Sequence, residues 1–154
     1  MVQKIIIDGV LQGVSAIVFN NRAEVLMLHR SGTGESYQSG WEFIKGGLHV
    51  GESHLEAALR EIREEAGPIE IEFVAELSRA YLADVRYRKK EYGWVEKKSL
   101  VFFCRSGEVS LSKEHSQHAW MSLSEACEVC WVEYGAEILR EAYRTFEQWQ
   151  TAHE

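Results

Sequence analysis

Three glutamates lie close together near the end of one predicted helix: Glu61, Glu64 and Glu65, in the segment REIREEAG at residues 60–67. Spacings of three and four residues place side chains on the same side of an α-helix. The C-terminal end of a helix already carries partial negative charge, so the cluster is unfavourable unless a cation lies nearby. Carboxylate oxygens are ligands that Mg²⁺ and Mn²⁺ prefer. The cluster therefore predicts a divalent cation site, and the alternative is a solvated acidic helix face.

The chemistry that such a cation favours is hydrolysis at phosphorus. A bound cation neutralises phosphate charge, positions an attacking water and lowers the pKa of that water. Arg60 follows Glu52 by eight residues and precedes Glu64 by four. It can therefore reach back to Glu52 and brace the preceding glycine turn, which contains Gly46 and Gly47, against the helix.

The helix that must carry this cluster has clear start and stop signals. Ser53 is a suitable N-cap, and Glu56 three residues later completes a capping-box pattern. Gly67 and Pro68 supply the stop. One apolar stripe at helical spacing predicts the face that packs on the core: Leu55, Ala58, Leu59, Ile62 and Ala66.

Short segments rich in β-branched residues surround this helix. Strands are predicted at residues 3–8, 14–19 and 24–29, with the last two forming a hairpin, then within 69–82, at 94–104 and around Val109 and Leu111. Residues 31–40 form a polar glycine and serine loop. A helix is predicted to begin near Ser122 or Ser124, and a C-terminal helix spans 134–149. This mixture predicts an α+β sandwich with a mixed sheet.

Composition limits the classes of function. The 154 residues are 45% hydrophobic, which fits a single domain over 1–154. A net charge of -7 argues against binding of long nucleic acid. The apolar run after Lys4 is too short for a signal peptide or a membrane span, so a cytoplasmic protein is expected. The three cysteines, including Cys127 and Cys130, are interpreted as structural thiols rather than zinc or redox groups.

The order of glycine, glutamate and arginine around the helix resembles a known signature. Gly46, five residues, Glu52, seven residues and then residues 60–67 look like the box of Nudix hydrolases, which cleave nucleoside diphosphates linked to another moiety. The family usually has an aliphatic residue where this chain has Pro68. The resemblance implies a Nudix α/β/α sandwich whose loop-helix-loop binds Mg²⁺, with Mn²⁺ as an alternative.

By the same resemblance, the metal ligands are Glu61, Glu64 and Glu65, and Glu64 could instead orient the attacking water. Arg60 and Glu52 form the brace, and a backbone carbonyl near Lys45 or Gly46 is a further ligand in similar proteins. We therefore expect these box residues to carry the reaction, with Lys45 beside the substrate.

Two segments outside the box resemble asymmetric diadenosine tetraphosphate hydrolases. One is WEFIKGG at residues 41–47, although Ile44 stands where those proteins usually have proline. The other is LSKEH at residues 111–115, where Glu114 corresponds to an extra metal ligand or general base. A carboxylate on a loop there could accept a proton from the attacking water. Without the resemblance, Glu114 would be interpreted as a surface residue.

Nucleotide recognition is expected from tyrosines and basic residues after the acidic helix. Tyr81, Tyr87 and Tyr92 could stack a base, and Lys98 occupies the place of a lysine that starts a strand in the subfamily. Other cations available for phosphates are Arg86, Arg88, Lys89 and Lys90, and His29 and Arg30 are further candidates. The alternative is a solvated hairpin tip.

Together these features predict a magnesium-dependent hydrolase of dinucleoside polyphosphates, with diadenosine tetraphosphate giving ATP and AMP. The same chemistry on a nucleoside triphosphate or on the 5' triphosphate end of RNA is the alternative. A non-catalytic nucleotide-binding module is a third class. The expected protein is a monomer or homodimer that does not contact membranes.

Overall fold

The computed structural model describes residues 3–30, 40–84 and 93–153. In chain order, the elements are β1 (Ile6–Ile7), β2 (Val10–Phe19), β3 (Val25–Arg30), β4 (Gly40–Glu42), β5 (Ile44–Gly47), α1 (His54–Ala66), β6 (Glu70–Glu76), β7 (Tyr81–Asp84), β8 (Trp94–Ser106), β9 (His115–Met121), α2 (Leu123–Val129) and α3 (Gly135–Ala152). Among these helices, none is long and apolar enough to span a membrane.

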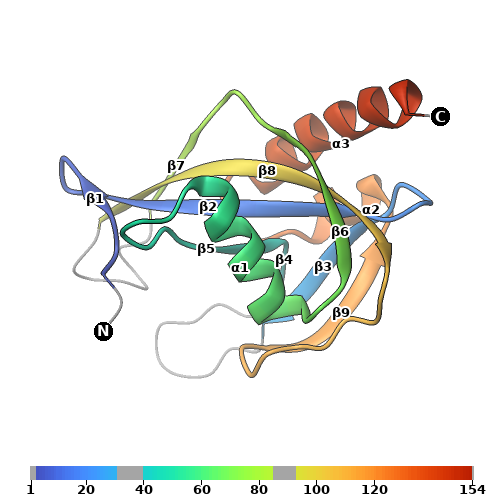
Figure 1. Ribbon diagram of the computed structural model, residues 1–154, viewed down its shortest axis with the longest axis horizontal. Helices are drawn as coiled ribbons and strands as arrows, with labels where there is room; N and C mark the ends of the chain where they lie inside the picture. The colour runs from blue at the N-terminus through green and yellow to red at the C-terminus, as the bar shows by residue number, and fades with distance from the viewer. Residues whose placement is uncertain (1–2, 31–39, 85–92, 154) are drawn as a thin grey trace.

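The centre of the sheet is the parallel pair β2 and β8, which runs in register from Leu11 opposite Val95 to Phe19 opposite Phe103. Strand β5 adds antiparallel to β2, and β6 and β7 add antiparallel to β8. Strand β3 pairs with β2 only where Phe19 faces Val25, and then pairs with β4 and β9 instead. The sheet is therefore mixed, with β3, β4 and β9 diverging from the central strands (Figure 1).

The sheet is covered on both faces, as the alternation of buried side chains along β2 shows. Val14, Ala16 and Val18 belong to a core that includes Ala58 and Ile62 of α1. Ile17 and Phe19, which alternate with these residues along β2, belong to a second core that includes residues of α3. Figure 1 shows α1 across the middle of the sheet and α3 on its far side. This arrangement confirms the predicted α+β sandwich and explains why β2 is buried from Leu11 onward.

Two strand predictions need correction. Residues 9–13 were expected to separate the strands predicted at 3–8 and 14–19, but β2 already begins at Val10, and Gly13 lies inside it opposite Gly47. A Cβ on Gly13 would lie 2.8 Å from the carbonyl oxygen of Gly46, so glycine permits the close approach of β5. The prediction of a strand around Val109 and Leu111 is also wrong. The next strand after β8 is β9, which begins only at His115. Its exposed polar positions, such as Gln117 and His118, hide the period-two pattern.

The helix α1 begins and ends as predicted. Ser53 is the N-cap and accepts a hydrogen bond of 3.1 Å from the backbone N–H of Glu56, whose carboxylate accepts one of 3.0 Å from the N–H of Ser53. Gly67 ends the helix with a φ of 85°, a conformation that favours glycine. The helix prediction from the sequence is therefore confirmed at both ends.

Replacing Ser53 with alanine is expected to lower the free energy of unfolding by about 1 kcal/mol, because a backbone N–H at the start of α1 loses its acceptor. Urea titration followed by circular dichroism measures this change. Ser78, an exposed serine outside the helices, provides the matched control, Ser78→Ala. Equal midpoints for the two variants would contradict the capping role.

Candidate active site

A cavity of about 480 Å³ opens beside the C-terminal half of α1. Its walls come from α1, β5, the first half of β8, the end of β3 and the segment before β9. The charged side chains in its lining are Lys4, Arg30, Lys45, His49, Arg60, Glu61, Glu64, Glu65, Lys97 and Glu114. The cavity therefore combines an acidic group on α1 with cations from other elements.

The three clustered glutamates of α1, Glu61, Glu64 and Glu65, differ in exposure because they lie at different distances from the apolar stripe. Glu61 and Glu65 are buried, whereas 56% of the Glu64 side chain is exposed. Burial and the adjacent Glu61 carboxylate raise the pKa of Glu65 well above its ordinary value. One carboxylate oxygen of Glu65 has no hydrogen-bond partner among the described residues. Crowded carboxylates and a buried oxygen without a partner fit a divalent cation bound against this helix.

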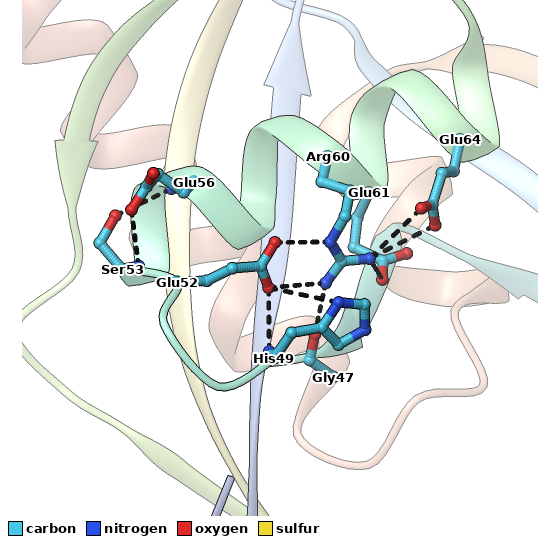
Figure 2. Close-up of polar contacts among 8 residues, drawn as sticks. All are labelled: Gly47, His49, Glu52, Ser53, Glu56, Arg60, Glu61 and Glu64. Atoms are coloured by element: carbon cyan, nitrogen blue, oxygen red, sulfur yellow. Dashed lines mark hydrogen bonds and ion pairs between the residues drawn. The ribbon is translucent and has the colours of Figure 1, made fainter. Parts of the chain in front are cut away.

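Arg60 braces the glycine turn against α1, as predicted (Figure 2). Its guanidinium donates to both carboxylate oxygens of Glu52, with Nε at 2.7 Å and Nη2 at 3.0 Å. Nη2 also donates to the carbonyl oxygen of Gly47 at 2.8 Å, and Nη1 donates to Glu61 at 2.7 Å. The hydrogen bonds to Glu52 raise the pKa of Arg60, and those from Arg60 lower the pKa of Glu52. The brace thus joins the turn to the acidic cluster.

Gly46 places its backbone directly against the acidic cluster. A Cβ at this position would overlap the carboxylate of Glu61, whereas a Cβ on the neighbouring Gly47 would meet none of the described atoms within 4 Å. The absence of a side chain at Gly46 therefore lets the Glu61 carboxylate lie against β5, inside the cavity.

Glu114 lies on the wall of the same cavity, just before β9. Its side chain is 61% exposed, and one oxygen lies 3.3 Å from Nη2 of Arg30. The structure therefore brings Glu114 together with the α1 glutamates, which are about fifty residues earlier in the chain. This position suits either of its expected roles, metal ligand or general base.

Two buried polar residues beside the cavity were missed from the sequence. Glu42 has a fully buried side chain that contacts Arg30, Lys45, Trp131 and the buried His115. Burial alone would raise the pKa of Glu42, but the hydrogen bond from His115 and the charges of Lys45 and Arg30 hold it well below its ordinary value. A charged residue within the apolar run WEFI was the available signal.

Glu42, Glu65 and His115 form a cluster whose ligand atoms lie within 4.8 Å of one another. A cation there would meet the guanidinium of Arg30 and the ammonium of Lys45, which already lie 3.2 Å and 3.7 Å from Glu42. Like charges at this range repel, so the carboxylates facing the cavity, on Glu61, Glu64 and Glu65, form the better cation site.

The predicted substrate-binding residues fall in three different places. Lys45 lines the cavity. Lys98 instead lies on the other face of β8 and pairs with Glu76 at 3.4 Å, and its neighbour Lys97 lines the cavity. Successive residues of a strand face opposite sides, so a shift of one residue decides which lysine reaches the site.

Tyr81 does not line the cavity. The residue is 7% exposed, in the core on the α3 side, and its hydroxyl donates to Glu141 at 2.9 Å. Burial and this bond raise the pKa of Tyr81 to about 12. The prediction that Tyr81 stacks a base does not fit this position. Tyr87 and Tyr92 lie outside the described residues, as do Arg86, Arg88, Lys89 and Lys90.

The cysteines fit the structural interpretation. All three are free thiols, and Cys104 is buried. Burial raises the pKa of Cys130 to about 11, and burial also raises the pKa of Cys127. A raised pKa keeps a thiol protonated at neutral pH, whereas zinc ligation and redox exchange need the thiolate.

Comparison with known proteins shows which family the chain resembles. The profile of the NUDIX domain family matches residues 10–146. The pig (Sus scrofa) protein named bis(5'-nucleosyl)-tetraphosphatase [asymmetrical] is 30% identical over 112 residues, which cover 68% of this chain and 70% of that protein. An RNA pyrophosphohydrolase of Halorhodospira halophila is 40% identical over 60 residues, which cover 39% of this chain and 30% of that one.

Among solved structures, a Caenorhabditis elegans Ap4A hydrolase in a binary complex superposes with a TM-score of 0.72. The superposition covers 93% of this chain and 99% of that chain at 20% sequence identity. At this identity the likeness concerns the fold alone. The family profile and the fold therefore agree with the site that the residues form.

Proposed function

Because the chain belongs to the Nudix family and is a pyrophosphohydrolase acting on acid anhydrides, we propose that it is a magnesium-dependent hydrolase of dinucleoside polyphosphates. Diadenosine tetraphosphate, cleaved to ATP and AMP, is the proposed model substrate. The observation that carries the proposal is one cavity with the carboxylates of Glu61, Glu64 and Glu65 on one wall and Glu114 on another.

In this proposal, Glu61, Glu64 and Glu65 hold the divalent cation. When bound, the cation neutralises phosphate charge and increases the acidity of the attacking water. Glu114 accepts the proton of that water, and Glu64 is the alternative acceptor. Both side chains are more than half exposed, so both are accessible to water in the cavity.

The remaining residues position the reacting groups. Arg60 and Glu52 hold the glycine turn in place through two short hydrogen bonds. Lys45 and Lys97 line the cavity on the side of the sheet, where their charges can attract phosphate oxygens that the cation does not neutralise. A chain of several phosphates fits this division of the cavity into acidic and basic parts.

The substrate class rests on the relatives. The pig protein, named for asymmetric cleavage of bis(5'-nucleosyl) tetraphosphates, matches 68% of this chain. The Halorhodospira relative, named an RNA pyrophosphohydrolase, matches a shorter part, and it is the reason to keep RNA 5' ends as the second candidate.

The test is a substrate panel of diadenosine tetraphosphate, free nucleoside triphosphates and a short RNA with a 5' triphosphate, each with Mg²⁺, with Mn²⁺ and with chelator. We expect AMP and ATP from the first substrate, and a rate with chelator that is about one hundredth of the Mg²⁺ rate or less. Chromatography of the products distinguishes the alternatives. Pyrophosphate release from RNA or from free nucleotides as the main activity would contradict the proposed substrate class, and binding without turnover would contradict catalysis.

A further inference from the structure

Glu42 is a buried carboxylate with donors on both of its oxygens. Oε2 accepts hydrogen bonds from Nε and Nη2 of Arg30, both at 3.2 Å, and lies 2.8 Å from Nε2 of His115. Oε1 accepts a bond of 3.1 Å from Nε1 of Trp131. The Glu42 side chain has 0% exposure, so these contacts replace its hydration.

These contacts connect Glu42 to the walls of the active-site cavity. Arg30, at the end of β3, uses the same Nη2 atom to contact Glu42 and Glu114, at 3.2 Å and 3.3 Å. Glu42 itself does not line the cavity, whereas Arg30 and Glu114 do. Arg30 is therefore a bridge between a fixed buried carboxylate and an exposed one.

The backbone places the bridge by an irregularity in the pairing of β3 and β9. His29 lies opposite Gln117, but Arg30 lies opposite His115, so one extra residue is inserted in β9. A bulge of this kind redirects the side chains beside it. Strands β3, β4 and β9 lie side by side, which brings Arg30, Glu42 and Glu114 together from distant parts of the sequence (Figure 1).

Among the residues that the structure describes, few other contacts hold Glu114. Its side chain is 61% exposed, and long exposed side chains otherwise sample several rotamers. Its backbone N–H donates to the Ser112 hydroxyl at 3.3 Å, which orients the main chain but not the carboxylate. Arg30, by contrast, has a side chain that is only 14% exposed and is fixed by two bonds to Glu42.

We propose that Glu42 is a positioning residue for the hydrolysis: it holds the guanidinium of Arg30 in the orientation that fixes the Glu114 carboxylate in the cavity. This inference rests on the proposed function, in which Glu114 acts on the attacking water. In this role Glu42 acts through Arg30, and it does not touch the substrate.

The first test is Glu42→Gln, which keeps the side-chain size but removes the charge and one acceptor oxygen. We expect kcat on diadenosine tetraphosphate to fall about tenfold with KM within about threefold of the parent, because a misplaced reacting group lowers turnover more than binding. Glu141→Gln is the matched control. It also removes a carboxylate that accepts a side-chain hydrogen bond, from Tyr81 on the α3 side of the sheet, and should leave kcat unchanged.

The second test separates positioning from a general structural role. In the Glu114→Gln background, Glu42→Gln should lower kcat by less than about twofold, since the group that Glu42 positions is already lost. A general structural role would instead lower kcat by the same factor in the parent and in the Glu114→Gln background. Thermal denaturation of each variant measures its stability and shows whether it is folded at the assay temperature.

Arg30→Lys provides a variant that keeps Glu42 and a positive charge but cannot share a planar guanidinium between two carboxylates. It should reproduce the fall in kcat expected for Glu42→Gln. If Glu42→Gln does not fold, Arg30→Lys alone tests the positioning role. A kcat for Arg30→Lys within about threefold of the parent, or equal factors for Glu42→Gln in both backgrounds, would overturn the positioning role while leaving the proposed function intact. If the unchanged protein hydrolyses nothing in the substrate panel, both proposals are wrong.

Discussion

Glu64→Gln is expected to lower kcat about a thousandfold, while the free energy of unfolding changes by less than about 0.5 kcal/mol. The two effects separate because of where Glu64 lies. Its side chain is 56% exposed, and its contacts with Arg60 are long, at 3.4 Å and 3.5 Å, so the fold depends little on its charge. The proposed cation and attacking water depend on the carboxylate, which an amide cannot replace as an anionic ligand.

Single-turnover and steady-state kinetics with Mg²⁺ measure the loss, and calorimetric titration with Mn²⁺ checks cation binding independently of turnover. Glu147→Gln is the matched control, because Glu147 is another exposed helical glutamate, on α3 and away from the cavity. If Glu64→Gln kept more than about a tenth of the parent kcat, the assignment of the catalytic helix face would be wrong.

Gly46→Ala is also expected to have a large effect and to lower kcat at least about a hundredfold. The new Cβ would overlap the carboxylate of Glu61, which must then leave its position against β5. Because this carboxylate is the flexible end of a side chain, the protein can still fold. The displacement also breaks the 2.7 Å bond from Arg60 to Glu61, so a proposed metal ligand and its brace are lost together.

The neighbouring Gly47→Ala variant controls for the general effect of a methyl group in this turn. A Cβ on Gly47 meets no atom of the described part of the chain within 4 Å, and the carbonyl oxygen that accepts from Arg60 is retained. We expect a loss of less than about fivefold for Gly47→Ala. Equal losses in the two variants would show that the turn, and not the Glu61 position, limits the reaction. Manganese affinity measured on both variants tests the same point without relying on turnover.

The local parts of the site could be predicted from the sequence because they depend on residues close together in the chain. The cap at Ser53, the stop at Gly67 and the shared face of Glu61, Glu64 and Glu65 follow from helix geometry. The brace between Arg60 and Glu52 spans eight residues and was confirmed in the structure. The family also followed from this one segment, since the box is contiguous.

The other parts of the site could not be predicted from the sequence, because they depend on how distant strands pair. The register of β8 decides that Lys97 faces the cavity and Lys98 does not, and a pattern without the neighbouring strand does not specify that register. Tyr81 was assigned to the substrate from its residue type, yet it is buried in the core that includes residues of α3. In both cases, the missing information was which face of a strand meets which layer.

By itself, the sequence determined the fold class, the family and the acidic helix that is proposed to bind the cation, because these features lie in local patterns of charge, glycine and periodicity. Only the tertiary structure decided which distant side chains join that helix. Arg30, Glu42 and Glu114 come from β3, β4 and the segment before β9, and their contacts span 12 and 84 residues. A contact of that span depends on sheet pairing and on the bulge in β9, and neither leaves a local signal in the sequence.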